Sequence, residues 1–386
     1  MRKHLWASIL FAGLLCAGGC AAPDRLHAVP ASLTGSLDFA HVARSRFSLD
    51  DTAALTEEIR WALSTRPNTE RNIDLLALSG GQEDGAFGAG LLTGWSEHGN
   101  RPKFTIVTGT STGALTAPFA FLGTDYDGAL EAMYTKTNIK DIISKRYLVA
   151  AITDDAMMDS SPLYRTISRY LTEDVLNRIA FEYRTGRLLL ISTTNLDSGK
   201  LVIWNVGAIA ASDNPRRLDL TRKIILASAA VPGLFPPVML DAKLKDGTHQ
   251  EMHVDGGTVS QVFLYPPQLD MRQIIDAVRP QSKTTAYIIR NGLVSPPPAE
   301  VPRQTLEIAQ RAIETMISST AVGDLYRIYS TTKRDDIGFK LAIMGEDFTE
   351  PYTTRFDLRY MRELYRYGHM KGAMGYPWQP SPPGFN

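Results

Sequence analysis

The stretch Gly109-Thr110-Ser111-Thr112-Gly113 follows an apolar strand pattern and precedes a helix pattern. In this G-x-S-x-G context the serine occupies a sharp strand-to-helix turn and its hydroxyl projects from the sheet. The flanking glycines, Gly109 and Gly113, let the neighbouring backbone come close. The pattern therefore predicts a nucleophile elbow with Ser111 as the nucleophile. The alternative is an ordinary tight turn that presents a serine to solvent.

A second stretch, LALSGGQEDGAFGAGLL (76–92), ends a strand pattern in two consecutive glycines. A serine nucleophile needs hydrogen-bond donors for the oxyanion that forms during attack. The N–H groups of Gly80 and Gly81 have no side chain to shield them, so we expect them to donate there. Three further glycines, Gly85, Gly88 and Gly90, lie in the following helix pattern. Each costs about 1 kcal/mol relative to alanine, and we expect them to form a flat face for close helix packing.

The base that activates Ser111 is either a histidine or a carboxylate. A triad in Ser–acid–His order would use His249, His253 or His369. In the sequence HVDGG, Asp255 ends a strand pattern immediately before two glycines, where a carboxylate can approach a serine directly. Burial would raise the basicity of that carboxylate. The residue types alone leave both alternatives open, because Asp-Gly is also a common turn pair.

The elements that position these residues alternate along the chain between strand and helix patterns. The strand patterns cover 72–79, 104–109, 187–195, 250–257, 285–291 and 337–344. A first helix pattern lies within 48–67, where Asp50 or Asp51 caps it and Pro67 ends it. Further helix patterns cover 83–98, 112–122, 162–183, 220–230, 303–330 and 355–374. Several strand patterns are continuously apolar, as expected for parallel strands buried on both faces. The alternation predicts a three-layer α/β/α sandwich with a mostly parallel central sheet.

Together these motifs resemble those of the patatin-like phospholipases. That family has a glycine-rich oxyanion loop, then a G-x-S-x-G elbow, then a late D-G-[GA] motif, and SGGQEDG, GTSTG and DGG follow here in that order. The segment ASAAVPGLFPPV (227–238) is similar to the family's Ala-rich segment that runs into P-x-x-F-x-P. The resemblance spans about 74–268 and implies hydrolysis of lipid acyl esters without a metal or other cofactor. It also implies that Ser111 is the nucleophile and that Asp255 is its dyad partner. The oxyanion donors that it implies are Gly80, Gly81 and Gln82.

Two positions of the oxyanion loop depart from the family pattern. Gln82 replaces the third glycine but can still donate its backbone N–H. Asp84 stands where the family has a basic residue. Acting near the scissile bond, Asp84 would weaken attraction to an anionic headgroup and favour neutral or zwitterionic esters. Two alternatives remain open: an α/β-hydrolase esterase with a histidine base, and an inactive lipid-binding lipoprotein.

The N-terminus has the organisation of an export signal. Basic Arg2 and Lys3 precede an apolar run, 5–17, which is shorter than the roughly 20 residues that span a bilayer. The sequence AGGC ends at Cys20 and resembles the lipobox of bacterial lipoproteins, in which the cysteine carries the lipid. The alternative is a plain signal cut after Ala22. The chain has two cysteines, Cys16 and Cys20, so the body after the signal has none to form a disulfide.

These features predict an organisation of signal peptide 1–20, tether 21–48, catalytic α/β domain 49–294, C-terminal helical extension 303–375 and Pro-rich tail 376–386. We expect a lipoprotein anchored to a membrane of the bacterial cell envelope, or alternatively a secreted or periplasmic protein. The chain contains 41 basic and 41 acidic residues, so no bulk charge indicates nucleic acid. The expected partners are therefore a lipid or other acyl-ester substrate and, through the anchor, a membrane surface.

Overall fold

The computed structural model describes residues 25–30, 32–33, 39–50, 52–145, 156, 158–293 and 300–385. The expected signal peptide and its lipid-attachment residue, Cys20, lie outside these residues. Within the described ranges, no helix combines the length and the apolar character that crossing a membrane requires. The motif residues singled out above, from Gly80 to Asp255, all lie within the described ranges.

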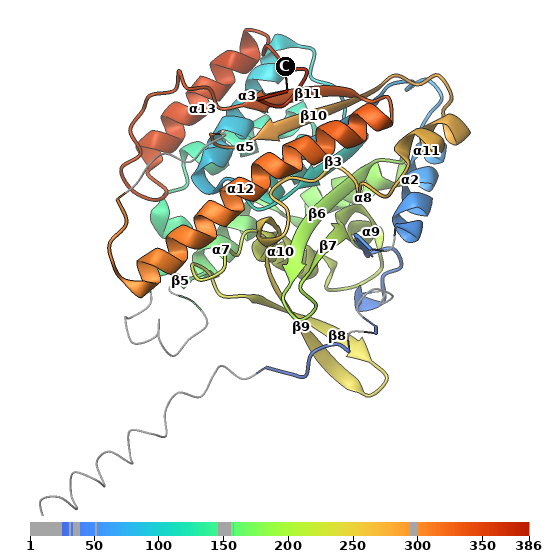
Figure 1. The fold of residues 1–386 in the computed structure, drawn as a ribbon. Coiled ribbons are helices and arrows are strands. Elements are labelled where there is room, and N and C mark those ends of the chain that lie inside the picture. The colour runs from blue at the N-terminus through green and yellow to red at the C-terminus, as the bar shows by residue number, and fades with distance from the viewer. Residues whose placement is uncertain are drawn as a thin grey trace, which may run out of the picture.

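A nine-stranded sheet forms the centre of the molecule, in the order β1-β7-β6-β3-β2-β10-β11, with β9 attached to β6 and β8 to β9 (Figure 1). The strands of this sheet are β1 Arg46–Ser48, β2 Ile73–Leu78, β3 Ile106–Gly109, β6 Leu188–Asn195, β7 Lys200–Asn205, β8 Val238–Leu244, β9 Gly247–Asp255, β10 Thr284–Arg290 and β11 Gly338–Ile343. Strands β6, β3, β2, β10 and β11 run parallel, whereas the pairings of β1, β7, β8 and β9 are antiparallel. The prediction of a mostly parallel central sheet is confirmed.

Helices cover both faces of the sheet, because side chains along each strand alternate between two apolar cores. Leu76 and Leu78 of β2 belong to one core, and Leu75 and Ala77 belong to the other. The first core receives α3 Gly85–His98, α4 Thr112–Leu122, α5 Asp127–Thr135, α7 Ser161–Tyr170, α8 Glu173–Arg184, α9 Val206–Ala211, α10 Arg217–Ser228 and α13 Leu358–Ala373. The second receives α2 Ala53–Thr65, α11 Met271–Val278 and α12 Thr305–Arg334. The three-layer sandwich is therefore also confirmed.

One predicted helix is divided in the structure. The pattern over 162–183 forms two helices, α7 and α8, rather than one. Thr172 ends the first stretch and caps the second, since its hydroxyl accepts the N–H of Val175 at 3.4 Å. A side-chain oxygen at this position replaces a missing helical hydrogen-bond partner and favours a new helix start.

The segment expected to be a tether contributes to the fold instead. Residues 46–48 form β1, which pairs with β7 at the antiparallel edge of the sheet. Phe39 is buried against Trp204, and Arg46 forms a buried ion pair with Glu251 at 2.5 Å. The tether prediction is wrong for this part of the chain because its few apolar residues and Arg46 find partners far away in the sequence.

The C-terminal segments are also more integrated than expected. The segment 303–375 supplies β11, which extends the central sheet parallel to β10, and is not only a helical packing layer. In the Pro-rich tail, Trp378 packs against Trp95 and Tyr287. Gln379 forms a β-bridge with Leu341 of β11. The Pro-rich tail is therefore packed onto the fold.

Close packing between α3 and α13 explains part of the glycine content of the stretch 76–92. A Cβ on Gly90 would overlap the carbonyl oxygen of Tyr365, and one on Gly368 would overlap that of Phe87. Gly85 and Gly88 pack just as closely, against Thr112 and Asn291. The prediction that these helical glycines serve close packing is confirmed.

We therefore expect Gly90→Ala to lower the free energy of unfolding by about 1–3 kcal/mol, because overpacking against a backbone oxygen forces the two helices apart. Gly128→Ala is the matched control, since a Cβ at Gly128 in α5 would meet no atom within 4 Å. Alanine there should be neutral or stabilising by up to about 1 kcal/mol. Denaturant unfolding of both variants measures the difference, and equal stability of the two would contradict the packing argument.

Candidate active site

Ser111 sits at a strained turn between β3 and α4. Its φ of 56° and ψ of −125° are unusual for a residue with a side chain. The turn is possible because its glycines allow close contact: a Cβ on Gly113 would overlap the carbonyl oxygen of Leu78. The Ser111 N–H donates to the hydroxyl of Ser228 at 3.0 Å. The backbone thus fixes the Ser111 side chain at the carboxyl edge of the parallel strands.

Asp255 lies beside Ser111. It ends β9, and its carboxylate accepts the N–H of Gly257 at 2.7 Å, while the Ser111 hydroxyl is close enough to lower the pKa of this carboxyl. Ser111 is 4% exposed and Asp255 is 2% exposed. Burial raises the pKa of Asp255 from 3.8 to about 7, although the Ser111 hydroxyl and the Gly257 N–H oppose the rise. A carboxyl with a pKa near neutrality is suited to accept a proton from a serine.

The three candidate histidines are engaged elsewhere. His249 contacts the carbonyl of Ala28 at 3.0 Å. His253 contacts Thr193 at 2.9 Å through Nδ1, and its other ring nitrogen contacts Glu251, while His369 lies 3.2 Å from Glu97. Within the described part of the chain, no hydrogen bond or ion pair joins these rings to Ser111, and no three His, Cys, Asp or Glu side chains cluster as a metal ion would require.

The oxyanion loop differs from the expectation at Gly80. The backbone N–H of Gly80 donates to the carbonyl of Gln261 at 2.9 Å, so it is not available to an oxyanion. A Cβ at this position would overlap the side-chain oxygen of Gln261 and lie 3.1 Å from the Cβ of Ser111. The predicted role of Gly80 as an oxyanion donor is therefore corrected: glycine is needed there because the loop passes between Gln261 and the nucleophile.

Gly81 and Gln82 retain the geometry of available donors. Among the residues that the structure describes, neither backbone N–H donates a hydrogen bond. Gln82, at the third-glycine position of the family pattern, has a φ of 52°, in the region that favours glycine. Its side-chain oxygen accepts a hydrogen bond from Arg355 at 2.8 Å, which holds the side chain away from the backbone N–H.

An apolar cavity adjoins Ser111. The polar residues Gln82, Glu83 and Thr112 lie in its wall beside Ser111. The apolar side chains that line it are Leu115, Met133, Ile142, Leu163, Ile167, Ala229, Val231, Phe235, Phe356 and Met361. Such a lining favours a hydrocarbon chain over a polar ligand.

Asp84 does not line this cavity, contrary to the expectation that it faces the headgroup near the scissile bond. Its carboxylate accepts the hydroxyl of Tyr360 at 2.7 Å. Burial raises the pKa of Asp84 to about 6, against the effect of the Tyr360 bond. The buried guanidinium of Arg290, which donates to the carbonyl of Gly80 at 3.2 Å, interacts with it electrostatically. Asp84 thus lies behind the oxyanion loop, within electrostatic reach of Arg290.

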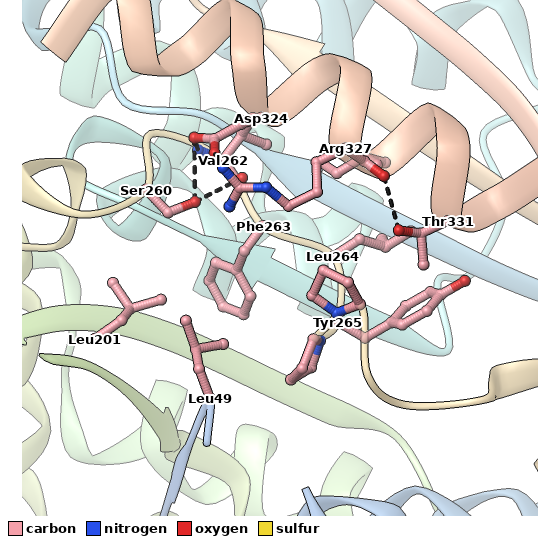
Figure 2. A pocket seen from close by; sticks show the side chains of 13 residues that line it. Leu49, Leu201, Ser260, Val262, Phe263, Leu264, Tyr265, Asp324, Arg327 and Thr331 are labelled. Carbon is pink, nitrogen blue, oxygen red and sulfur yellow. Dashed lines mark hydrogen bonds and ion pairs between the residues drawn. The ribbon is translucent and has the colours of Figure 1, made fainter. Parts of the chain in front are cut away.

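Asp324 of α12 is a positioning residue that the sequence patterns did not reveal. Its carboxylate accepts the Ser260 hydroxyl at 3.1 Å and the N–H of Gln261 at 2.7 Å. Figure 2 shows Asp324 above this loop, in the wall of a second pocket of about 430 Å³. That pocket contains neither Ser111 nor Asp255. Asp324 fixes the loop whose Gln261 carbonyl holds Gly80 beside the nucleophile.

Comparison with known proteins finds a family match over the part of the chain that holds these residues. A family model described as patatin-like phospholipase matches residues 76–266. The matched range includes Ser111, Asp255 and the oxyanion loop. The chain therefore carries a patatin-like phospholipase domain, the family that its motifs resemble.

Curated relatives include patatin-like phospholipase domain-containing proteins of fungi. The protein from Aspergillus niger is 29% identical over 229 residues, which cover 51% of this chain and 26% of that protein. The protein from Emericella nidulans is 30% identical over 190 residues, covering 45% of this chain and 22% of that protein. This chain thus spans about a quarter of the length of these relatives. Among solved structures, VipD from Legionella pneumophila aligns over 80% of this chain and 69% of its own, with 12% identity and a TM-score of 0.33.

Proposed function

We propose that this protein is a serine-dependent hydrolase of lipid acyl esters that works through an acyl-enzyme. One observation carries this proposal: the buried Ser111 hydroxyl lies beside the carboxyl of Asp255, whose pKa burial raises to about 7, at the wall of an apolar cavity. The patatin-like phospholipase domain and the names of the fungal relatives support the same chemistry.

In the first half of the reaction, Asp255 takes the proton of Ser111 while the serine oxygen bonds to the ester carbonyl carbon. The negative charge that develops on the carbonyl oxygen accepts hydrogen bonds from the N–H groups of Gly81 and Gln82, and the N-terminus of α4 stabilises it further. The carbon–oxygen bond to the alcohol then breaks, and the alcohol leaves with the proton from Asp255.

In the second half, Asp255 takes a proton from water as the water oxygen bonds to the acyl carbon. The bond to the Ser111 oxygen breaks, the serine recovers its proton, and the fatty acid leaves. The apolar cavity holds the acyl chain throughout, so its methylene groups remain out of water. The same two residues therefore serve both halves of the cycle, without a histidine.

Hydrolysis of p-nitrophenyl octanoate and of a phospholipid panel by the purified protein and its Ser111→Ala variant tests this function. The expected result is hydrolysis by the parent protein alone, together with fluorophosphonate labelling that requires Ser111. An inactive lipid-binding lipoprotein would neither hydrolyse esters nor label, and that result would overturn the proposal. Activity that persists in Ser111→Ala would instead exclude Ser111 as the nucleophile.

We also propose that Cys20 is lipidated and holds the mature protein at a membrane of the cell envelope. The support is the AGGC sequence after a short apolar run and the lack of cysteine beyond Cys20. Each buried CH₂ of an acyl chain contributes about 0.8 kcal/mol, so several chains anchor firmly.

Cys20→Ser should therefore shift the protein from the membrane fraction to a soluble or unprocessed form. Cys16→Ser is the matched control and should leave the protein in the membrane fraction. Fractionation and mass spectrometry of the N-terminal peptide measure both outcomes. An unmodified mature N-terminus beyond Cys20 would show that lipidation does not occur.

A further inference from the structure

A segment of the C-terminal extension, residues 355–360, contacts the oxyanion loop at three consecutive residues. Each contact is a hydrogen bond from the segment to a side-chain oxygen of the loop. The three bonds run from Arg355 to Gln82 at 2.8 Å, from the Phe356 N–H to Glu83 at 3.4 Å and from the Tyr360 hydroxyl to Asp84 at 2.7 Å. The family model ends at residue 266, so this segment brings groups from outside the matched range to the candidate active site.

Gln82 is the loop residue whose backbone most needs such support. Its φ of 52° lies in the left-handed region, which glycine tolerates and which a residue with a side chain disfavours. Among the described residues, its N–H donates no hydrogen bond that would hold this conformation. The bond from Arg355 to its side-chain oxygen therefore opposes a rotation of Gln82 to an ordinary conformation, in which the N–H would point away from a bound ester.

Arg355 reaches Gln82 from a fixed position. Its guanidinium also pairs with Glu314 of α12, because a planar guanidinium can donate to two acceptors at once. The next residue, Phe356, is 8% exposed and lines the cavity together with Ser111. An ion pair and a buried aromatic ring thus fix the point from which Arg355 holds the loop.

We propose that Arg355 is a positioning residue that keeps the Gln82 N–H directed at the ester carbonyl oxygen. This inference rests on the proposed esterase function and adds the C-terminal segment to its machinery. The carbonyl oxygen becomes negatively charged only as the serine attacks, so a misdirected N–H weakens the transition state more than it weakens substrate binding. Arg355 therefore acts on kcat, with little effect on KM.

Steady-state hydrolysis of p-nitrophenyl octanoate by Arg355→Met tests this role. Methionine cannot donate to Gln82, so kcat should fall about tenfold or more while KM changes less than about threefold. Arg355→Lys still offers a donor and should lose less of kcat than Arg355→Met. The matched control is Arg359→Met, because the Arg359 side chain is 78% exposed and pairs with Glu350 rather than with the loop. That control should keep the kcat of the parent protein.

A second background separates positioning from a general loss of packing. In Gln82→Gly the backbone can adopt a left-handed φ without an anchor, and no side chain is left for Arg355 to hold. Adding Arg355→Met to Gln82→Gly should therefore lower kcat by less than about threefold. If Arg355→Met costs the same factor in both backgrounds, it does not act through Gln82 and the proposal is overturned.

Hydrogen exchange of the loop amides provides a readout that needs no turnover. The Asp84 N–H donates to the Gly81 carbonyl at 3.0 Å and the Gly85 N–H donates to the Gln82 carbonyl, so the exchange of these two amides reports on the conformation of the loop. Arg355→Met should speed their exchange by about threefold or more, since the loop opens more often without its support. Arg359→Met should leave the exchange unchanged.

Each contrary result has a separate meaning. Unchanged kcat in a folded Arg355→Met variant of an active parent overturns the proposal, and so does a rise in KM alone, since the segment would then only shape the cavity. Unchanged loop exchange in Arg355→Met overturns it as well, whether or not the parent hydrolyses esters. Hydrolysis of p-nitrophenyl octanoate that does not require Ser111 overturns the proposed function instead, and the exchange measurement still decides whether Arg355 holds the loop.

Discussion

Asp255→Asn is expected to abolish turnover as completely as Ser111→Ala, by about 10³-fold or more, and the double variant should be no worse than either single variant. Members of one catalytic unit fail together because each step needs both. Asparagine keeps the size of the side chain and can still accept the Gly257 N–H, but it cannot take the serine proton. Steady-state hydrolysis of p-nitrophenyl octanoate by purified variants measures the loss.

The histidine variants provide the control for this prediction. His249→Ala, His253→Ala and His369→Ala should each keep substantial activity, because their rings are bonded to groups other than Ser111. Circular dichroism should verify that each variant is folded, above all His253→Ala, which removes a completely buried ring. If a folded histidine variant were as inactive as Ser111→Ala, the Ser–Asp dyad would be excluded and a triad with that histidine as the base would be favoured.

Local patterns in the sequence predicted the central elements of this site well. Apolar runs and glycine positions are short-range signals, so the strand before Ser111, the helix after it and the strand that ends at Asp255 are all visible in the sequence. Their order also carried the family resemblance, which the matched domain confirms. The predicted effect of burial on Asp255 has the direction found in the structure.

What the sequence did not reveal depends on contacts between distant residues. The carbonyl that occupies the Gly80 N–H belongs to Gln261, and the carboxylate that fixes Gln261 belongs to Asp324. Likewise, the expected tether becomes a strand because Arg46 finds Glu251 across the sheet edge. No local pattern marks such pairs, because each partner alone is compatible with an exposed loop or helix.

The pH dependence of the reaction should have a midpoint near 7, set by Asp255. The mechanism requires the ionised carboxylate, and burial raises the pKa of Asp255 to about 7. We therefore expect kcat/KM for an uncharged ester to be constant above about pH 8 and to fall about tenfold per pH unit below 7. At pH 5 the rate constant would be about a hundredfold lower than on the plateau.

Asp84 titrates in a neighbouring range, since its pKa is raised to about 6, so the profile must be repeated with Asp84→Asn. The midpoint should remain near 7 in that variant, because Asp84 lies behind the oxyanion loop and takes no proton from Ser111. A midpoint that moves with the Asp84 substitution would assign the titration to Asp84. A midpoint near the ordinary value of an aspartate, 3.8, would show that Asp255 is not a desolvated base.

Stability should change with pH in the opposite direction to activity. The folded pKa of Asp255 lies above its ordinary value of 3.8, so the native state binds this proton more tightly than the unfolded chain does. The stabilisation from that proton is complete below about pH 4 and is lost as the pH rises through about 7. Each pKa unit corresponds to about 1.4 kcal/mol.

Asp255→Asn removes this pH-dependent loss of stability. The free energy of unfolding of the variant, relative to that of the parent protein, should therefore increase between pH 4 and pH 8, as measured by denaturant titration at each pH. A difference that stays constant over this range would mean that Asp255 ionises as easily in the folded protein as in the unfolded chain, and the active carboxylate would then have to be sought elsewhere.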